Sequence, residues 1–137
     1  MSKTKTGSNA QFTSAGKGLT VIGDHCYAYS GTFGLTQDSQ TMLEFNTGKR
    51  YIIFDTYFTG PTSYSDPNSG REANFQISIN GIVIAFAHTD TSEAYIQESA
   101  RLRFLVPPLS LVKIEMDGND TTGSYLSSVL MTGDVYG

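Results

Sequence analysis

Apolar and polar residues alternate with a period of two over most of the chain after residue 18, whereas no amphipathic helix longer than two or three turns can be traced. The best-defined segment is a predicted hairpin, in which the apolar runs 74–79 and 82–87 flank the dipeptide Asn80-Gly81. Asn-Gly favours a type I′ turn, because both central residues of that turn need a positive φ. The pattern therefore predicts two antiparallel strands joined by a two-residue turn.

The register of this hairpin follows from the length of its turn. A two-residue loop places residues of the two strands directly opposite each other, and opposite residues share a face of the sheet. The predicted pairs are Ile79 with Ile82, Ile77 with Ile84, and Phe75 with Phe86. We therefore expect all six large apolar side chains on one face, against the core.

Seven further segments alternate in the same way, so that each has one plausible core face. They are 19–22, 25–33, 41–45, 51–59, 101–106, 111–116 and 125–136. Arg101 and Arg103 mark the solvent side of one segment, while the last segment is apolar on both faces for part of its length, as an inner strand would be. With the hairpin, these segments give eight or nine strands.

Turn-forming residues separate the segments, and two connections are long. One, 60–72, is rich in Pro, Ser and Gly; the other, 89–100, contains an Asp90-x-x-Glu93 spacing that suits a capping box and predicts a short helix. Many short strands with two long crossings indicate an all-β fold, an antiparallel β-sandwich, most economically a single jelly roll of about eight strands. An immunoglobulin-like sandwich is the alternative, without its Cys and Trp hallmarks.

Charge divides the 137-residue chain, which has a net charge of −4, into two parts. Residues 1–18 carry Lys3, Lys5 and Lys17 and no acid, which leaves 6 basic and 13 acidic residues in the remainder. We interpret 1–18 as a flexible basic N-terminal arm, with Phe12 as its one large apolar residue, and 19–137 as the jelly-roll domain. The acidic remainder argues against nucleic acid as a partner.

Membrane insertion and disulfide chemistry are also not predicted. No window approaches the 18 or so apolar residues of a membrane span, and the N-terminal lysines precede no apolar signal region. The single cysteine, Cys26, cannot form an internal disulfide, and we expect it to be a buried core residue.

Residues 73–137, roughly, contain motifs in an order that resembles small jelly-roll structural proteins of tailed-bacteriophage virions. These motifs are the hairpin FQISINGIVIAFAHT, the Leu105-Val106-Pro107-Pro108 that leads into the strand 109–115, and the ending LMTGDVYG. The resemblance implies a module that decorates or cements a capsid, or sits in a tail or fibre. It implies no catalytic residues.

Catalytic and metal chemistry have few candidate residues. His25 and Cys26 are adjacent on a predicted strand and so point to opposite faces, which excludes a direct dyad. His88 is expected at the rim of the hairpin, with a Cys26–His88 pair as a remote alternative. The chain has no His-x-His, and the turns 66–70 and 117–120 lack the final Glu of a calcium loop. The sequence therefore predicts no enzyme, no metal site and no cofactor.

Carbohydrate binding is the alternative function, because sugars stack on aromatic rings. Seven tyrosines are candidates for such stacking: Tyr27, Tyr29, Tyr51, Tyr57, Tyr64, Tyr95 and Tyr125. Tyr64 is the first to test, since its loop has no apolar neighbours in sequence. The absence of Trp weighs against this function.

The sequence thus predicts a non-enzymatic virion protein that binds the phage capsid surface as a decoration or cement subunit, made in the host cytoplasm. Its expected partners are capsid or other virion proteins and further copies of itself, a trimer being one arrangement. Neither nucleic acid nor membrane is expected, and a glycan is the alternative ligand, for a tail or fibre module. The residues expected to contact partners are Lys3, Lys5, Phe12, Lys17 and Tyr64.

Overall fold

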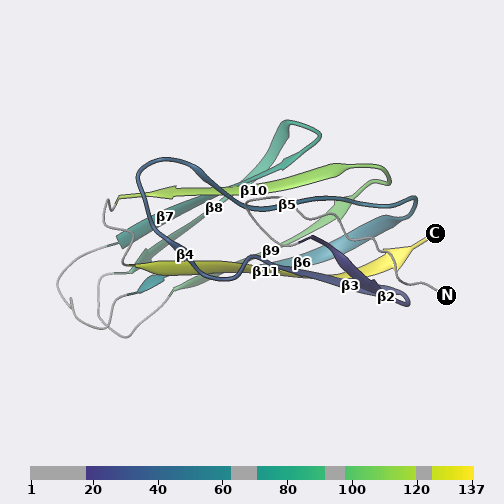
Figure 1. The fold of residues 1–137 in the computed structure, drawn as a ribbon, viewed down its shortest axis with the longest axis horizontal. Helices are drawn as coiled ribbons and strands as arrows, with labels where there is room; N and C mark the ends of the chain where they lie inside the picture. The colour runs from purple at the N-terminus through teal and green to yellow at the C-terminus, as the bar shows by residue number, and fades with distance from the viewer. Residues whose placement is uncertain (1–17, 63–70, 92–97, 120–124) are drawn as a thin grey trace.

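Two antiparallel β-sheets packed face to face make up the protein in a computed structural model (Figure 1). The structure describes residues 18–62, 71–91, 98–119 and 125–137. The described residues form strands and no helix. The strands are β2 (Thr20–Ile22), β3 (His25–Tyr29), β4 (Phe33–Gly34), β5 (Gln40–Asn46), β6 (Tyr51–Thr62), β7 (Arg71–Ile79), β8 (Ile82–Thr91), β9 (Ser99–Val106), β10 (Leu111–Gly118) and β11 (Leu126–Tyr136).

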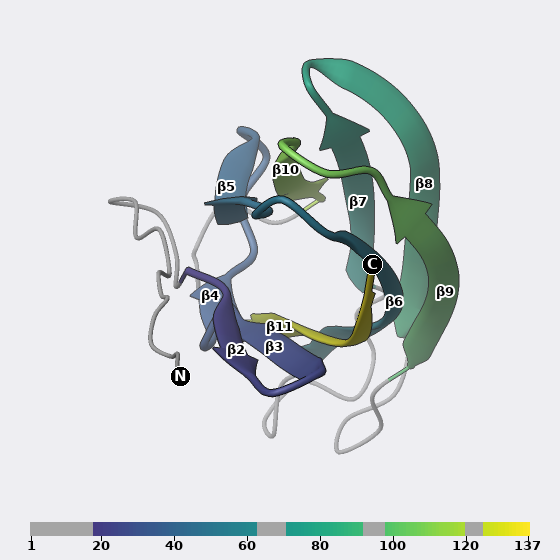
Figure 2. The same cartoon turned by 90° about the vertical axis from the view of Figure 1, so that its right-hand side faces the viewer.

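The order of the strands confirms the predicted jelly roll. One sheet has four strands in the order β5-β10-β7-β8, and the other runs β2-β3-β11-β6-β9, with β4 paired to β11. Apart from the short β2 and β4, eight strands remain, four in each sheet, and the chain crosses between the sheets except at the β7–β8 hairpin, as in a jelly roll. Viewed end-on, the two sheets enclose a single interior (Figure 2). The last strand, β11, lies inside its sheet, as its apolar pattern predicted.

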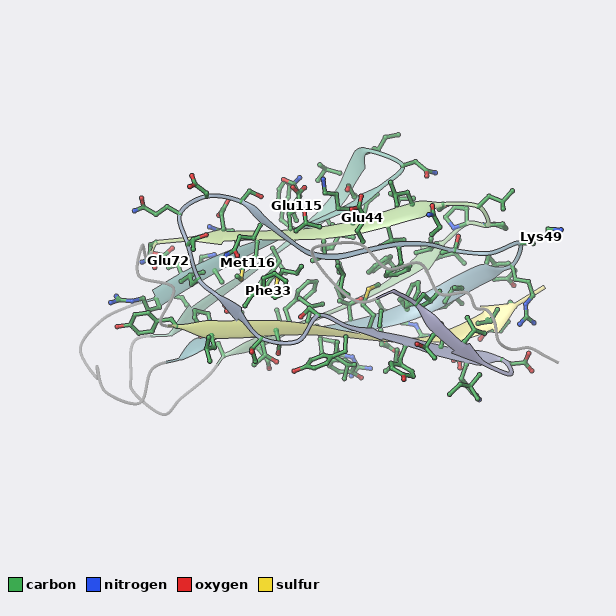
Figure 3. The ribbon with its side chains drawn as sticks, viewed as in Figure 1. Phe33, Glu44, Lys49, Glu72, Glu115 and Met116 are labelled. Carbon is green, nitrogen blue, oxygen red and sulfur yellow. The ribbon has the colours of Figure 1, made fainter. Side chains whose placement is uncertain are left out.

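The core fills the space between the sheets with the residues that alternation placed inward. Four phenylalanines that no solvent reaches come from both sheets: Phe45, Phe54, Phe58 and Phe75. The rings of Phe58 and Phe75 lie 4.9 Å apart, joining β6 to β7. On β10, Val112, Ile114 and Met116 are buried, and Met116 points between the sheets (Figure 3). Full burial of a Phe or Ile side chain stabilises the fold by roughly 1.5–3 kcal/mol.

The predicted turn of the β7–β8 hairpin is confirmed. Asn80 and Gly81 both have positive φ, 53° and 81°. Asn80 also ties the turn to β10, because its N–H donates to the Leu111 carbonyl at 2.8 Å and its Oδ1 accepts from the Leu111 N–H at 2.8 Å.

The predicted register of this hairpin holds only next to the turn. Ile79 pairs with Ile82, but the ladder shifts between Ser78 and Ile77, so that Ile77 pairs with Ala85 and Phe75 with Ala87. Ile84 is the extra residue of a β-bulge on β8. A slip of one residue turns every later side chain to the opposite face. The slip accounts for Ile84 and Phe86, while Ile82 keeps its predicted partner beside the turn. The expectation that these three residues lie in the core is wrong, because all three are exposed.

Small residues line the inner side of β8 because another strand lies close to it. A Cβ atom added to Gly60 of β6 would come within 2.3 Å of Thr89 Oγ1, so neither position has room for a larger side chain. Ala85, Ala87 and Thr89 face inward here. The bulge at Ile84 therefore leaves small side chains on the inner side of β8 and places Phe86 on the outer side.

The short helix predicted over 89–100 does not begin at Asp90. That residue belongs to β8 and pairs with Glu72, and its backbone N–H donates to the Glu98 carboxylate instead of starting a helix. Residues 92–97 lie outside the described part of the chain. Ser99 and Ala100 are already in β9.

Candidate interaction surfaces

The partner-binding residues expected from the sequence all fall in segments that the structure does not describe. Lys3, Lys5, Phe12 and Lys17 lie in 1–17, and Tyr64 lies in 63–70. The candidate surfaces below are therefore built from other residues.

The outer face of the six-stranded sheet gathers tyrosines that are far apart in sequence. Alternation along β3 buries Cys26 and Ala28 and exposes Tyr27 and Tyr29. Pairing across the sheet then places Tyr29, Leu130, Tyr57 and Arg101 in one row, and Tyr27, Thr132, Asp55 and Arg103 in the next. We call these eight residues the tyrosine face.

Asp55 links the two arginines of this face. Its carboxylate oxygens lie 3.4 Å from Arg101 Nη2 and 3.1 Å from Arg103 Nη1. The Arg101 guanidinium also lies over the ring of Tyr57, 5.2 Å from its centroid. These contacts pair both arginines with one carboxylate, so the eight residues carry a net charge of only +1.

The structure also places Tyr51 and Tyr125, two other tyrosines that were candidates for stacking on a sugar. Tyr51 stacks on Tyr136 at the far end of the same sheet, with centroids 5.3 Å apart. Tyr125 is buried instead of exposed, and the Arg71 guanidinium lies 4.1 Å from its ring centroid. Tyr125 therefore does not offer a stacking surface to a sugar.

The outer face of the four-stranded sheet is acidic. Glu44 and Glu115 point outward from this sheet (Figure 3). Five carboxylates share this side with one lysine, Lys113: they are Glu44, Glu72, Asp90, Glu115 and Asp117. Lys113 Nζ lies 3.7 Å from Glu115 Oε2, which offsets one of them. Five carboxylates therefore lie on this face, whereas the tyrosine face contains one carboxylate, that of Asp55, between two arginines.

The histidines and the cysteine do not form a catalytic group. Cys26 is buried, as predicted, and its burial, together with the smaller effect of the charge of Asp134, raises the pKa of its thiol to about 12. His25 points outward, where its Nδ1 lies 2.9 Å from Asp134 Oδ1. His88 lies on the outer side of the other sheet, 2.7 Å from Asn74 Oδ1, so the Cys26–His88 pair is excluded.

Metal ligands do not cluster in the described residues, where no group of three or more His, Cys, Asp or Glu side chains could hold an ion. Of the proposed calcium-type turns, 66–70 lies outside the described segments. In the other, Asp117 accepts a hydrogen bond from Asn74 at 3.1 Å and Asn119 accepts one from the Glu72 N–H at 3.0 Å. Both side chains thus have partners on β7, as expected of residues that shape a turn.

A search for membrane-spanning helices among the described residues finds no candidate.

Comparisons with known proteins identify the fold. No protein-family model and no curated protein matches the chain. Over 93% of its length, the chain matches 35% of a chain in the crystal structure of the T13 IBDV viral particle, with a TM-score of 0.51 and 9% sequence identity. The shared feature is the fold. The same architecture therefore occurs in a chain of an icosahedral viral particle.

A second solved structure is also similar. The chain matches dimeric latent PorU from Porphyromonas gingivalis over 92% of its own length and 14% of that chain, with a TM-score of 0.44 and 14% identity. The chain thus spans well under half of the length of both proteins.

Proposed function

We propose that the protein is a non-enzymatic virion structural protein that binds the surface of a phage capsid as a decoration or cement subunit. The observation that carries this proposal is the tyrosine face, presented on a fold that also occurs in a viral particle. The partners are capsid or other virion proteins.

The chemistry of this face suits a protein partner. Tyr and Arg are enriched at protein interfaces and supply most of the residues whose loss weakens binding strongly. Tyr29, Tyr57 and Leu130 provide exposed apolar area in one row, and Asp55 balances part of the charge of the neighbouring arginines. Because the side chains stand on a sheet, little ordering is needed on binding, and this lowers the entropic cost of association.

Cosedimentation with capsids that lack the subunit tests the proposal. We expect the wild-type protein to pellet with such particles, and Leu130→Lys to weaken binding at least tenfold because it places a charge in the centre of the face. The control is Leu109→Lys, which makes the same chemical change at an exposed leucine of the β9–β10 connection. Wild-type protein that stays in the supernatant, or equal binding by both variants, would contradict the proposal.

A glycan-binding function, in a tail or fibre, is the second candidate. It is supported by the position of Tyr57, whose ring lies beneath the Arg101 guanidinium, while Asp55 occupies the adjoining row of the same face. A sugar could stack on such a ring while its hydroxyls bond to the charged groups. A glycan array decides between the capsid-binding and glycan-binding functions. Glycan binding that is lost in Tyr57→Ala and kept in Tyr136→Ala would favour the glycan-binding function. An array with no signal would exclude that function.

A further inference from the structure

The four edges of the two sheets differ in how they are protected against pairing with another strand. Exposed edges normally carry charges, prolines or bulges, or are very short. β2 has three residues, β5 carries Glu44, and β9 carries Arg101 and Arg103 and is followed by Pro107-Pro108. β8 has ten residues, and its first six, Ile82–Ala87, carry no charge.

Large apolar side chains are exposed along this same stretch. Phe86 is 73% exposed and Ile82 is 69% exposed, and Val83 and Ile84 are 42% and 43% exposed. The hairpin that bears them rises above the rest of its sheet (Figure 1). In the described part of the chain, β7 is the only strand that pairs with β8, so no strand is hydrogen-bonded to the other edge of β8, although β6 and β9 come close to this strand.

The bulge at Ile84 determines which residues face outward. Val83 pairs with Ser78 and Phe86 with Gln76, on the outer side of the sheet, whereas Ala85 and Ala87 face the core. Phe86 thus stands between two alanines that point the other way, and nothing on its own strand covers it.

We propose that β8 pairs with β8 of a second copy, antiparallel, about a two-fold axis at Phe86. This pairing does not depend on the proposed capsid role. It places Phe86 opposite the partner's Phe86 and Ala85 opposite the partner's Ala87, and joins the two four-stranded sheets into one. The register is self-consistent, because a two-fold axis perpendicular to a sheet keeps each side chain on its own face and opposite residues share a face.

For a second copy, charge favours the antiparallel orientation over the parallel one. Glu72 and Asp90 lie side by side at the end of the β7–β8 ladder that is remote from the turn. Antiparallel pairing puts these acidic ends of the two copies at opposite ends of the joint sheet, whereas parallel pairing would place them together. The two phenylalanines meet at the axis, where an aromatic cross-strand pair contributes favourably.

The size of the contact predicts a weak dimer. Only the outward apolar side chains and main chain of one strand are covered in each copy, which is less than the roughly 800 Å² per partner of a stable interface. We therefore expect a weak dimer, which forms in concentrated solution or among copies held on one surface.

Light scattering of the full-length protein between about 5 and 500 μM tests this proposal. The mass is expected to rise from monomer to dimer, and Phe86→Lys is expected to weaken dimerisation at least tenfold, because it places two like charges directly opposite each other at the axis. Leu109→Lys, at a residue that is 74% exposed, is the matched control and should dimerise like wild type. Circular dichroism should confirm that both variants are folded.

Oxidative cross-linking tests the register itself. Directly opposite Cα atoms lie about 4.5–5.5 Å apart, within reach of a disulfide, so Phe86→Cys should form a disulfide dimer faster than Leu109→Cys. The native Cys26 adds no background, because it is buried. A trimer, a monomer throughout the concentration range, equal masses for Phe86→Lys and wild type, or equal cross-linking of the two cysteine variants would overturn the proposal.

Discussion

Phe86 lies directly opposite Gln76 on the β7–β8 ladder, one residue away from the partner that a regular hairpin would give it. The bulged Ile84 causes this shift, and Phe75 faces Ala87 instead. One local irregularity therefore separates two phenylalanines that the sequence pattern had placed together, one in the core and one on the surface.

Truncation of these two side chains should affect stability to very different extents. Phe75→Ala removes a fully buried ring that packs on Phe58, and we expect it to lower the free energy of unfolding by about 3–5 kcal/mol. Phe86→Ala should change it by less than about 0.5 kcal/mol. Urea denaturation at low micromolar protein measures both. A large loss in Phe86→Ala would mean that this ring is buried and the bulge absent.

The tight turn of the same hairpin gives a second prediction. Gly81 has a φ of 81°, in the left-handed region that costs a residue with a Cβ atom about 1–2 kcal/mol, so Gly81→Ala should destabilise by that amount. Gly48→Ala is the control, because Gly48 has no such φ and no atom would contact its Cβ. We expect it to be neutral or slightly stabilising in thermal unfolding. An equal loss of stability in Gly81→Ala and Gly48→Ala would argue against the type I′ turn.

The buried thiol of Cys26 should make stability fall at alkaline pH. Its pKa rises from 9.0 to about 12 in the folded state, so above pH 9 the unfolded chain loses this proton while the folded chain keeps it. The stabilising contribution is complete below pH 9 and decreases by about 1.4 kcal/mol per unit up to pH 12.

Denaturation of wild type and Cys26→Ala from pH 7 to 11 isolates this contribution, since both proteins share the titration of the tyrosines. The difference between their stabilities should be constant up to about pH 9 and narrow above it. A constant difference over the whole range would contradict the prediction, as would rapid alkylation of native Cys26 at pH 8.

The Asp55 cluster predicts a salt-dependent contribution to stability. Asp55 is the more buried member of its pairs, with 22% of its side chain exposed against 62% and 60% for Arg101 and Arg103. We expect Asp55→Asn to cost about 0.5–1 kcal/mol at low salt and less at 1 M salt, because the remaining arginines repel each other. Asp24→Asn, in an exposed pair with Arg50, should be nearly neutral. Chemical denaturation at the two salt concentrations checks both variants.

Much of the fold was predictable because side-chain alternation is a local property. The inward residues of β6, β9 and β10, the central position of β11, the Asn80-Gly81 turn and the buried Cys26 all follow from neighbouring residues alone. Each of these features depends only on which face of a single strand a side chain occupies, and the period-two alternation of the sequence gives that face.

The surfaces were less predictable because they combine strands that are distant in the chain. Tyr29 and Tyr57 were recognised as candidates, yet only the insertion of β11 between β3 and β6 brings Leu130 between them. The group of carboxylates on the outer face of the four-stranded sheet also combines residues from strands that are distant in the chain. Leu130 could have been noticed as an apolar residue on the polar side of its strand.

The sequence by itself determined that this chain is an all-β sandwich, which residues alternate inward, and where one tight turn lies. The tertiary structure decided the register of β8, the composition of the two outer faces and which sheet edge is left open. The reason is that alternation distinguishes the two sides of a strand, whereas the space available on either side depends on strands elsewhere in the chain. At β8 the bulge at Ile84 shifted the pairing by one residue, so that Ala85 and Ala87 face the core and Phe86 faces outward.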